Sequence, residues 1–161
     1  MEQTSSRDLK AALRSSGQRY TKQREAVYDI LQTCGTHPSA DEIYALVRER
    51  IPHISLATVY KALDSLVNAG LAAQIPGLDG PTRFDRSPLP HIHVRSLSDG
   101  KVYDVPREIE EEAMADLALD LAARLQEEVG FRMARISLEI LGEFAPDRQP
   151  DADTRKGKRD V

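Results

Sequence analysis

Two of the four histidines of this chain, His91 and His93, are separated by a single residue. On an extended strand, residues two positions apart project from the same face, so both imidazoles can reach one point. Asp85 before this pair, Asp104 after it and His37 in an earlier loop could complete a ligand set. Three imidazoles and two carboxylates form a nitrogen/oxygen donor set without sulfur, which suits a divalent transition metal.

The spacing alone leaves other interpretations open. A His-x-His pair on a strand is often exposed at the surface and binds no ligand. The two aspartates could cap turns or pair with neighbouring arginines. The fourth histidine, His53, follows Pro52 and has no obvious ligand neighbours. A metal site is therefore one hypothesis among several at this level.

Apolar residues recur at helical spacing through the first 70 residues. We expect a short helix over 8–15 and three more helices capped by Thr21, Ser39 and Ser55, with Glu42 completing a capping box at the third. Their apolar faces are formed by Val27, Ile30 and Leu31, by Ile43, Leu46 and Val47, and by Leu56, Val59, Leu63, Leu66 and Val67. Extended runs at 71–75 and 82–85, separated by proline and glycine, then predict a hairpin.

Helices followed by a two-stranded hairpin are the order of a winged helix-turn-helix. The helix over 55–69 would then enter the major groove of DNA, with Thr58, Tyr60 and Lys61 among its exposed side chains. These side chains can contact base edges and phosphates. Many three-helix domains bind no DNA, however, so the same pattern also fits a helical domain without a role in DNA binding.

Charge is unevenly distributed along the chain, whose net charge is −4. Residues 1–86 carry 11 basic and 10 acidic side chains, whereas residues 87–161 carry 11 and 16. Between positions 7 and 24 there are six basic residues and one acidic residue: Arg7, Lys10, Arg14, Arg19, Lys22 and Arg24 against Asp8. Such a stretch can neutralise DNA phosphates, although a solvated basic helix face is the plainer interpretation.

The second half changes to an α/β pattern. After a stiff connector at 87–90 we expect strands over 91–97 and 101–105, a long helix over 108–128 and a strand over 131–141. The predicted organisation is a DNA-binding domain (1–86), a hinge (87–90), an α/β domain (91–145) and a disordered tail (146–161). One helix on a small sheet buries little apolar surface, so we expect a homodimer.

Composition excludes several classes of protein. The single cysteine, Cys34, rules out an internal disulfide and any cluster of thiolates from one chain. There is no apolar run of membrane-spanning length and no signal-peptide pattern, so we expect a cytoplasmic protein without membrane partners.

Several motifs together resemble the ferric uptake regulator (Fur) family of metal-dependent repressors. They are residues 17–24 (GQRYTKQR), 37–44 (HPSADEIY), 55–66 (SLATVYKALDSL), 91–93 (HIH), 100–104 (GKVYD) and the closing segment from Gly130 to Gly142. The resemblance runs from about position 9 to 144. It implies an α+β fold, with an N-terminal winged-helix DNA-binding domain and a C-terminal α/β dimerisation domain. It also implies that the protein binds double-stranded operator DNA as a homodimer.

The resemblance also assigns roles to particular residues. It implies that one regulatory divalent metal per chain is held at the hinge by His37, Asp85, His91, His93 and Asp104. It implies DNA contacts by Arg14, Arg19, Ser55, Thr58, Tyr60 and Lys61. Tyr60 would contact a base, while Lys61 stands where the family usually has arginine.

One family feature is missing from this sequence. Most members carry two Cys-x-x-Cys pairs that hold a structural zinc, but here Ser96 and Asp99 replace the first pair, and the second falls near Phe144 and Asp147. We therefore expect no structural four-cysteine zinc. The dimer would depend on apolar packing, with Phe144 filling some of the vacated space.

The aspartates at both carboxylate positions resemble the peroxide-sensing PerR branch of the family, because iron sensors commonly have glutamates there. The expected metal is Fe²⁺ or Mn²⁺, with Zn²⁺ a further possibility in vitro. A sensor of iron, manganese or zinc level is the alternative within the family. A mononuclear non-haem iron enzyme is the alternative from another class. It is disfavoured because no other part of the sequence indicates a substrate pocket.

Overall fold

The computed structural model describes residues 6–89, 91–133 and 137–145. The chain divides into two compact units between Pro88 and Leu89, inside the connector expected at 87–90. We refer to them as the first and second unit. Among the described residues, none of the helices has the length and apolar character needed to cross a membrane.

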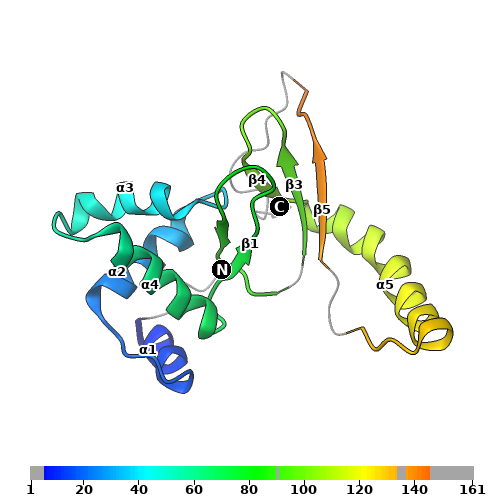
Figure 1. Cartoon of the computed structure of the whole chain (residues 1–161), viewed down its shortest axis with the longest axis horizontal. Coiled ribbons are helices and arrows are strands. Elements are labelled where there is room, and N and C mark those ends of the chain that lie inside the picture. Colours follow the sequence, from blue (N-terminus) through cyan, green and yellow to red (C-terminus); the bar gives the residue numbers. More distant parts are fainter. Residues whose placement is uncertain (1–5, 90, 134–136, 146–161) are drawn as a thin grey trace, which may run out of the picture. The chain divides into compact units, whose positions relative to one another are not determined.

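The first unit contains four helices followed by a hairpin (Figure 1). Its elements are α1 (Ser6–Ser15), α2 (Lys22–Thr33), α3 (Ala40–Arg50), α4 (Leu56–Asn68), β1 (Ala73–Ile75) and β2 (Arg83–Asp85). The predicted caps are confirmed, because the side chains of Thr21, Ser39 and Ser55 each accept a hydrogen bond from a backbone N–H in the first turn of the following helix. These caps fix where three of the helices begin.

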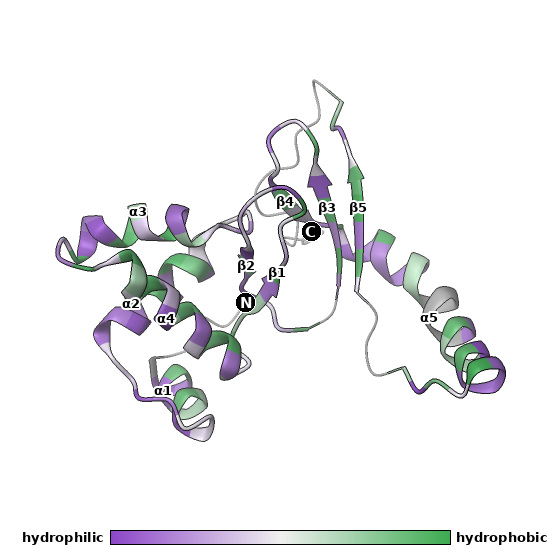
Figure 2. Ribbon diagram, viewed as in Figure 1, coloured by the Kyte–Doolittle hydropathy of each residue, from purple (hydrophilic) through white to green (hydrophobic). Residues whose placement is uncertain are grey.

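The apolar faces of these helices meet in one core. Fully buried side chains come from all four helices and from the hairpin: Leu9, Leu13, Val27, Leu31, Ile43, Val47, Val59, Leu63, Leu66 and Phe84. In Figure 2 hydrophobic and hydrophilic residues alternate along α2 and α4, as expected for helices with one buried face. The prediction that Leu46 belongs to the buried face of α3 is wrong, since its side chain is 39% exposed. Ile43 and Val47, one turn apart, are the α3 side chains that pack fully into the core.

The hairpin pairs β1 with β2 in antiparallel register, so that Ala73 lies opposite Asp85. Its loop is tight at Gly77, where an added Cβ would lie 2.0 Å from the carbonyl oxygen of Gly80. The hairpin is also joined to the segment before α3, because the Phe84 N–H donates to the Pro38 carbonyl at 2.9 Å. The wing strand that carries Asp85 is thus fixed to the loop that carries His37.

The second unit is a three-stranded sheet with one long helix. Its elements are β3 (Ile92–Ser96), β4 (Val102–Asp104), α5 (Arg107–Val129) and β5 (Leu138–Gly142). The strand order is β4-β3-β5, with β3 antiparallel to β4 and parallel to β5. A parallel pair requires a long crossover connection, and α5 lies within that connection. The α+β class predicted from the sequence is confirmed.

The final strand is shorter than the sequence pattern indicated. We predicted a strand over 131–141, but Phe131–Met133 are not in a strand and β5 covers only Leu138–Gly142. Gly130 ends α5 with a φ of 69°, and the Phe131 N–H donates back to the Leu125 carbonyl at 2.9 Å. This helix cap uses the N–H of Phe131 and so delays the strand. Ile136 and the tail predicted at 146–161 lie outside the described residues.

Ser96 and Asp99 take part in local hydrogen bonds at the turn between β3 and β4, and an aromatic pair lies elsewhere in the same unit. The Ser96 and Ser98 hydroxyl oxygens are 2.8 Å apart, and the Lys101 N–H donates to the Asp99 carboxylate. Tyr103 and Phe144 pack edge to face with ring centroids 5.2 Å apart. Phe144 therefore packs against Tyr103 of β4, while its filling of the space left by the absent cysteines stays a prediction.

Candidate functional site

The second unit brings three of the expected metal ligands together. His93 on β3 lies directly opposite Asp104 on β4, and 3.8 Å separates His93 Nε2 from Asp104 Oδ1. His91, two residues before His93, places its Nε2 2.8 Å from the same carboxylate oxygen. The two imidazole centroids are 4.2 Å apart, which confirms that both rings lie on one face. Together the three side chains form a compact cluster of nitrogen and oxygen donors.

The hydrogen bonds of His91 favour ligation through one particular nitrogen. Its Nδ1 is 2.7 Å from the carbonyl oxygen of Leu89, and a carbonyl oxygen can only accept. Nδ1 therefore donates to Leu89, which leaves Nε2 as the nitrogen that could bind a metal ion. Nε2 and Asp104 Oδ1 are 2.8 Å apart, so both atoms could contact one cation.

A residue that sequence reasoning missed fixes the main chain between the two histidines. Glu110, in the first turn of α5, accepts a hydrogen bond from the Ile92 N–H at 3.1 Å. The contact links the long helix to the strand that carries the ligands. Glu110 begins a run of three acidic residues, and its sequence neighbours do not distinguish it.

The first unit brings the other two expected ligands together. His37, in the loop before α3, places Nδ1 3.7 Å from Oδ1 of Asp85, the last residue of β2. Their side chains are 6% and 1% exposed. The Ser87 N–H donates to the same Asp85 oxygen at 2.8 Å, which orients the carboxylate. A buried imidazole beside a buried, oriented carboxylate is a second pair of competent donors.

The donor chemistry of both groups fits a divalent metal ion. Imidazole nitrogen and carboxylate oxygen suit Mn²⁺, Fe²⁺ and Zn²⁺. The thiol of Cys34 lies at the C-terminal cap of α2, on neither strand that carries a ligand. The residues present therefore support a sulfur-free site.

The DNA-reading face expected on α4 is exposed. Tyr60 is 43% exposed and Lys61 is also exposed, whereas Val59 and Leu63 of the same helix are fully buried. This burial pattern makes Tyr60 a surface residue and not part of the core. The helix therefore offers an aromatic hydroxyl and an ammonium group to a partner.

Ser55 and Thr58 have a structural role at the start of α4. The Ser55 hydroxyl accepts from the Thr58 N–H at 3.1 Å, and the two hydroxyl oxygens are 2.8 Å apart. Both hydroxyls lie at the surface and keep spare lone pairs. Their observed hydrogen bonds cap the helix.

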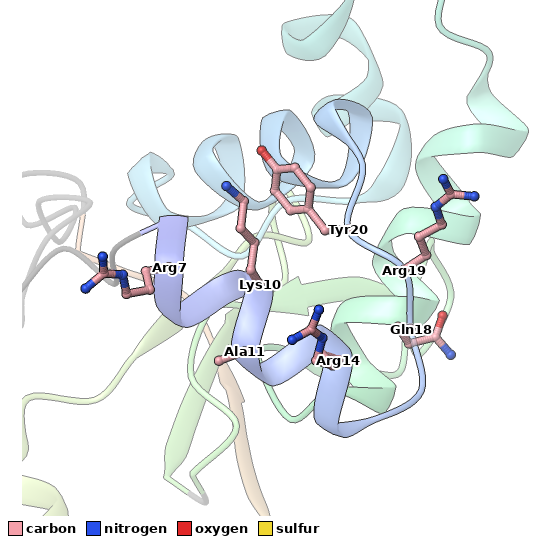
Figure 3. A pocket seen from close by; sticks show the side chains of 7 residues that line it. All are labelled: Arg7, Lys10, Ala11, Arg14, Gln18, Arg19 and Tyr20. Atoms are coloured by element: carbon pink, nitrogen blue, oxygen red, sulfur yellow. The ribbon is translucent and has the colours of Figure 1, made fainter.

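Arg14 and Arg19 line an open basic hollow of about 570 Å³ beside α1 (Figure 3). Its lining residues are Arg7, Lys10, Ala11, Arg14, Gln18, Arg19 and Tyr20. The Lys10 ammonium lies 4.6 Å from the centroid of the Tyr20 ring. Arg7, Lys10 and Arg14 recur at spacings of three and four, which places them on one face of α1. The hollow concentrates positive charge as a phosphate-binding surface requires.

The four helices and the wing, followed by a small α/β unit with clustered histidines, define a two-domain architecture. It consists of an N-terminal winged-helix DNA-binding domain and a C-terminal dimerisation domain. The chain belongs to the ferric uptake regulator family, whose model matches residues 15–140.

Known proteins similar to this chain include a repressor and two regulators. The peroxide-responsive repressor PerR of Staphylococcus saprophyticus is 39% identical over 97 residues, which are 60% of this chain and 66% of that protein, just under two thirds of its length. A zinc-bound manganese uptake regulator is 30% identical with a TM-score of 0.62, over 85% of this chain and 98% of that one. The Campylobacter jejuni peroxide stress regulator is 28% identical with a TM-score of 0.60, over 92% of this chain and all of that one.

Proposed function

We propose that this protein is a metal-dependent, dimeric transcriptional repressor of the cytoplasm, regulated by one divalent ion per chain. The observation that carries the proposal is the placement of donors on both sides of the connector. His37 and Asp85 precede it, and His91, His93 and Asp104 follow it. An ion held by all five would link the DNA-binding unit to the dimerisation unit and fix the spacing of two winged helices on successive turns of DNA.

The signal that we favour is hydrogen peroxide. The PerR relative, named for its response to peroxide, supports this, as do the two aspartates in the donor set. Iron(II), when bound, would supply the reducing electrons that peroxide needs. The imidazoles of His37 and His91 would help to hold the ion, and we expect one of them to be oxidised. Manganese(II) on the same donors is much less reactive toward peroxide.

A sensor of metal level is the second candidate within the family. It is favoured by the similarity to a manganese uptake regulator. A titration of operator DNA with apo, Mn²⁺ and Fe²⁺ protein, each with and without peroxide, separates the candidates. Specific DNA binding that requires metal supports a repressor, and loss of binding only for iron plus peroxide supports peroxide sensing. Turnover of an organic substrate, without metal-dependent DNA binding, would instead indicate a non-haem iron enzyme.

We predict that the protein is a homodimer without tightly bound zinc. Several apolar side chains of the second unit are exposed in the single chain: Ile109, Leu121, Val129, Phe131, Ile140 and Leu141. Ile140→Glu should convert the dimer to a monomer in sedimentation, because Ile140 lies on β5 and is 49% exposed. Leu78→Glu, on an exposed leucine of the wing, is the matched control and should remain dimeric. A zinc ion retained per chain after chelation would contradict the prediction.

Tyr60 and Lys61 should act at the DNA in different ways. Tyr60→Ala should reduce discrimination between operator and random DNA, by roughly 1–3 kcal/mol for a lost base contact. Lys61→Ala should weaken binding to all sequences and reduce the salt dependence by about one phosphate contact. Fluorescence anisotropy across a salt series measures both effects. Lys101→Ala, an exposed lysine of the second unit, should bind as the wild type does. Loss of metal affinity in the Tyr60 variant would indicate a folding defect.

A further inference from the structure

We infer that Arg83 is a positioning residue that connects the His37–Asp85 pair to the first turn of α3, so that metal binding is transmitted into the DNA-binding unit. The inference rests on the proposed function, because it concerns the same metal. Arg83 is not a ligand itself. It acts through the main chain of one ligand and through the capping residue of a helix.

The contacts of Arg83 are made by a buried guanidinium group. Its side chain is 8% exposed, and Nη1 donates to the carbonyl oxygen of His37 at 2.8 Å and to Glu42 Oε2 at 3.1 Å. A buried cation is stable only where such partners satisfy it. Here the partners are the backbone of one expected metal ligand and an acid in the first turn of α3.

Glu42 extends the connection into the helix. Its Oε2, the oxygen bound by Arg83, also accepts from the Ser39 N–H at 2.7 Å, while the Glu42 N–H donates to the Ser39 hydroxyl at 3.3 Å. These last two bonds form the capping box of α3. A shift of the His37 main chain would therefore disturb Arg83 and the start of α3 together.

Arg83 and Asp85 also share one face of β2, because they are two residues apart on the strand. An isolated antiparallel bridge between Ser39 and Arg83, together with the Phe84–Pro38 hydrogen bond, holds residues 37–39 against this strand. Arg83 then fixes the carbonyl of His37 beside the strand that carries Asp85. The two donors are thus set relative to each other through Arg83 and the main chain.

The charge of Glu42 has a separate consequence. A guanidinium two residues from a metal-binding carboxylate repels a divalent cation, and the Glu42 carboxylate at 3.1 Å offsets that repulsion. Glu42→Gln retains an oxygen that can accept a hydrogen bond but removes the negative charge. It should therefore weaken metal binding while leaving most of the cap intact.

The experiment compares full-length wild-type protein with Arg83→Gln, Arg83→Lys and Arg86→Gln by calorimetric titration with Mn²⁺. Arg83→Gln should bind Mn²⁺ roughly 10–100-fold more weakly, the range for residues that orient metal ligands. Arg83→Lys keeps the charge with a single donor atom and should be intermediate. Arg86 is the matched control: it also donates from Nη1 to a backbone carbonyl, but to that of Gln32 on α2. Arg86→Gln should match the wild type.

Hydrogen exchange provides a readout that a purely structural role would not change. In the wild type, Mn²⁺ should slow exchange of the amides at 39–42, at the start of α3. In Arg83→Gln at saturating Mn²⁺ this slowing should disappear, while the amides of α2 and α4 exchange as in the wild type. Slowing that persists in the saturated variant would overturn the connection to α3.

The outcomes distinguish this inference from the proposed function. Wild-type protein that binds neither Mn²⁺ nor DNA overturns the proposed function. A wild type that responds to Mn²⁺ and an Arg83→Gln that matches it overturn only the role of Arg83. If Arg83→Gln fails to fold, Glu42→Gln decides. The Glu42 side chain is 48% exposed, so this variant should fold, and Mn²⁺ affinity equal to wild type would again overturn the inference.

Discussion

Hydrogen peroxide should release the iron-loaded protein from its operator and leave the manganese-loaded protein bound. The physical reason is the proposed donor set, in which imidazole and carboxylate groups would hold the ion, and of the two metals only Fe²⁺ readily gives electrons to peroxide. His37 or His91 would be oxidised at the site. Fluorescence anisotropy of labelled operator DNA, recorded before and after low peroxide for both metal forms, measures the effect.

The site of the chemical change can be identified in the same samples. Peptide mass spectrometry should find a gain of one oxygen atom on the peptide that carries His37 or the peptide that carries His91, only in the iron form. The peptide that carries His53, an exposed histidine outside both donor groups, should remain unmodified and serves as an internal control. Equal insensitivity of the two metal forms would favour a sensor of metal level.

Cys34 is the competing target for peroxide. Burial raises the pKa of its thiol, the Glu42 carboxylate raises it further, and Arg86 opposes both effects. A raised pKa leaves less of the reactive thiolate at neutral pH. The iron-loaded Cys34→Ser variant should therefore release operator DNA on peroxide treatment, as the wild type does. If this variant no longer responds, the thiol and not the metal site senses peroxide.

Much of the candidate site could be predicted from local patterns. The alternation of a strand places His91 and His93 on one face whatever surrounds them, and the structure confirms it. The capping residues Thr21, Ser39 and Ser55 could also be read directly, because a cap acts over three residues. These predictions from short-range geometry agreed with the structure, whereas the placement of Leu46 on the buried face of α3 did not.

Contacts between residues distant in the sequence were not predicted. Arg83 contacts the main chain of His37 across 46 residues, and Glu110 contacts that of Ile92 across 18 residues. A hydrogen bond to a backbone group leaves no complementary side chain in the sequence by which to recognise it. The late start of β5 has a similar cause, because hydrophobic alternation does not show that a helix cap has already used the Phe131 N–H.

Removing one ligand from either unit should abolish metal-dependent DNA binding, which is the strongest test of a shared ion. His91→Ala removes a donor of the second unit. Asp85→Asn removes the charge from a donor of the first unit but keeps an oxygen that can accept the Ser87 N–H. Each should reduce Mn²⁺ affinity by roughly 100-fold or more, since even outer partners contribute 10–100-fold.

The comparison of the two variants decides whether the five donors belong to one site. With one shared ion, both variants lose Mn²⁺ affinity, measured by calorimetry, and both lose specific DNA affinity at Mn²⁺ levels that saturate the wild type. His53→Ala, which removes an imidazole from outside both donor groups, should keep wild-type metal affinity. Retention of Mn²⁺-dependent DNA binding by Asp85→Asn, together with its loss in His91→Ala, would place the ion in the second unit alone. The proposal that a shared metal ion fixes the winged helix would then be wrong, because the ion would have no ligand in the unit that binds DNA.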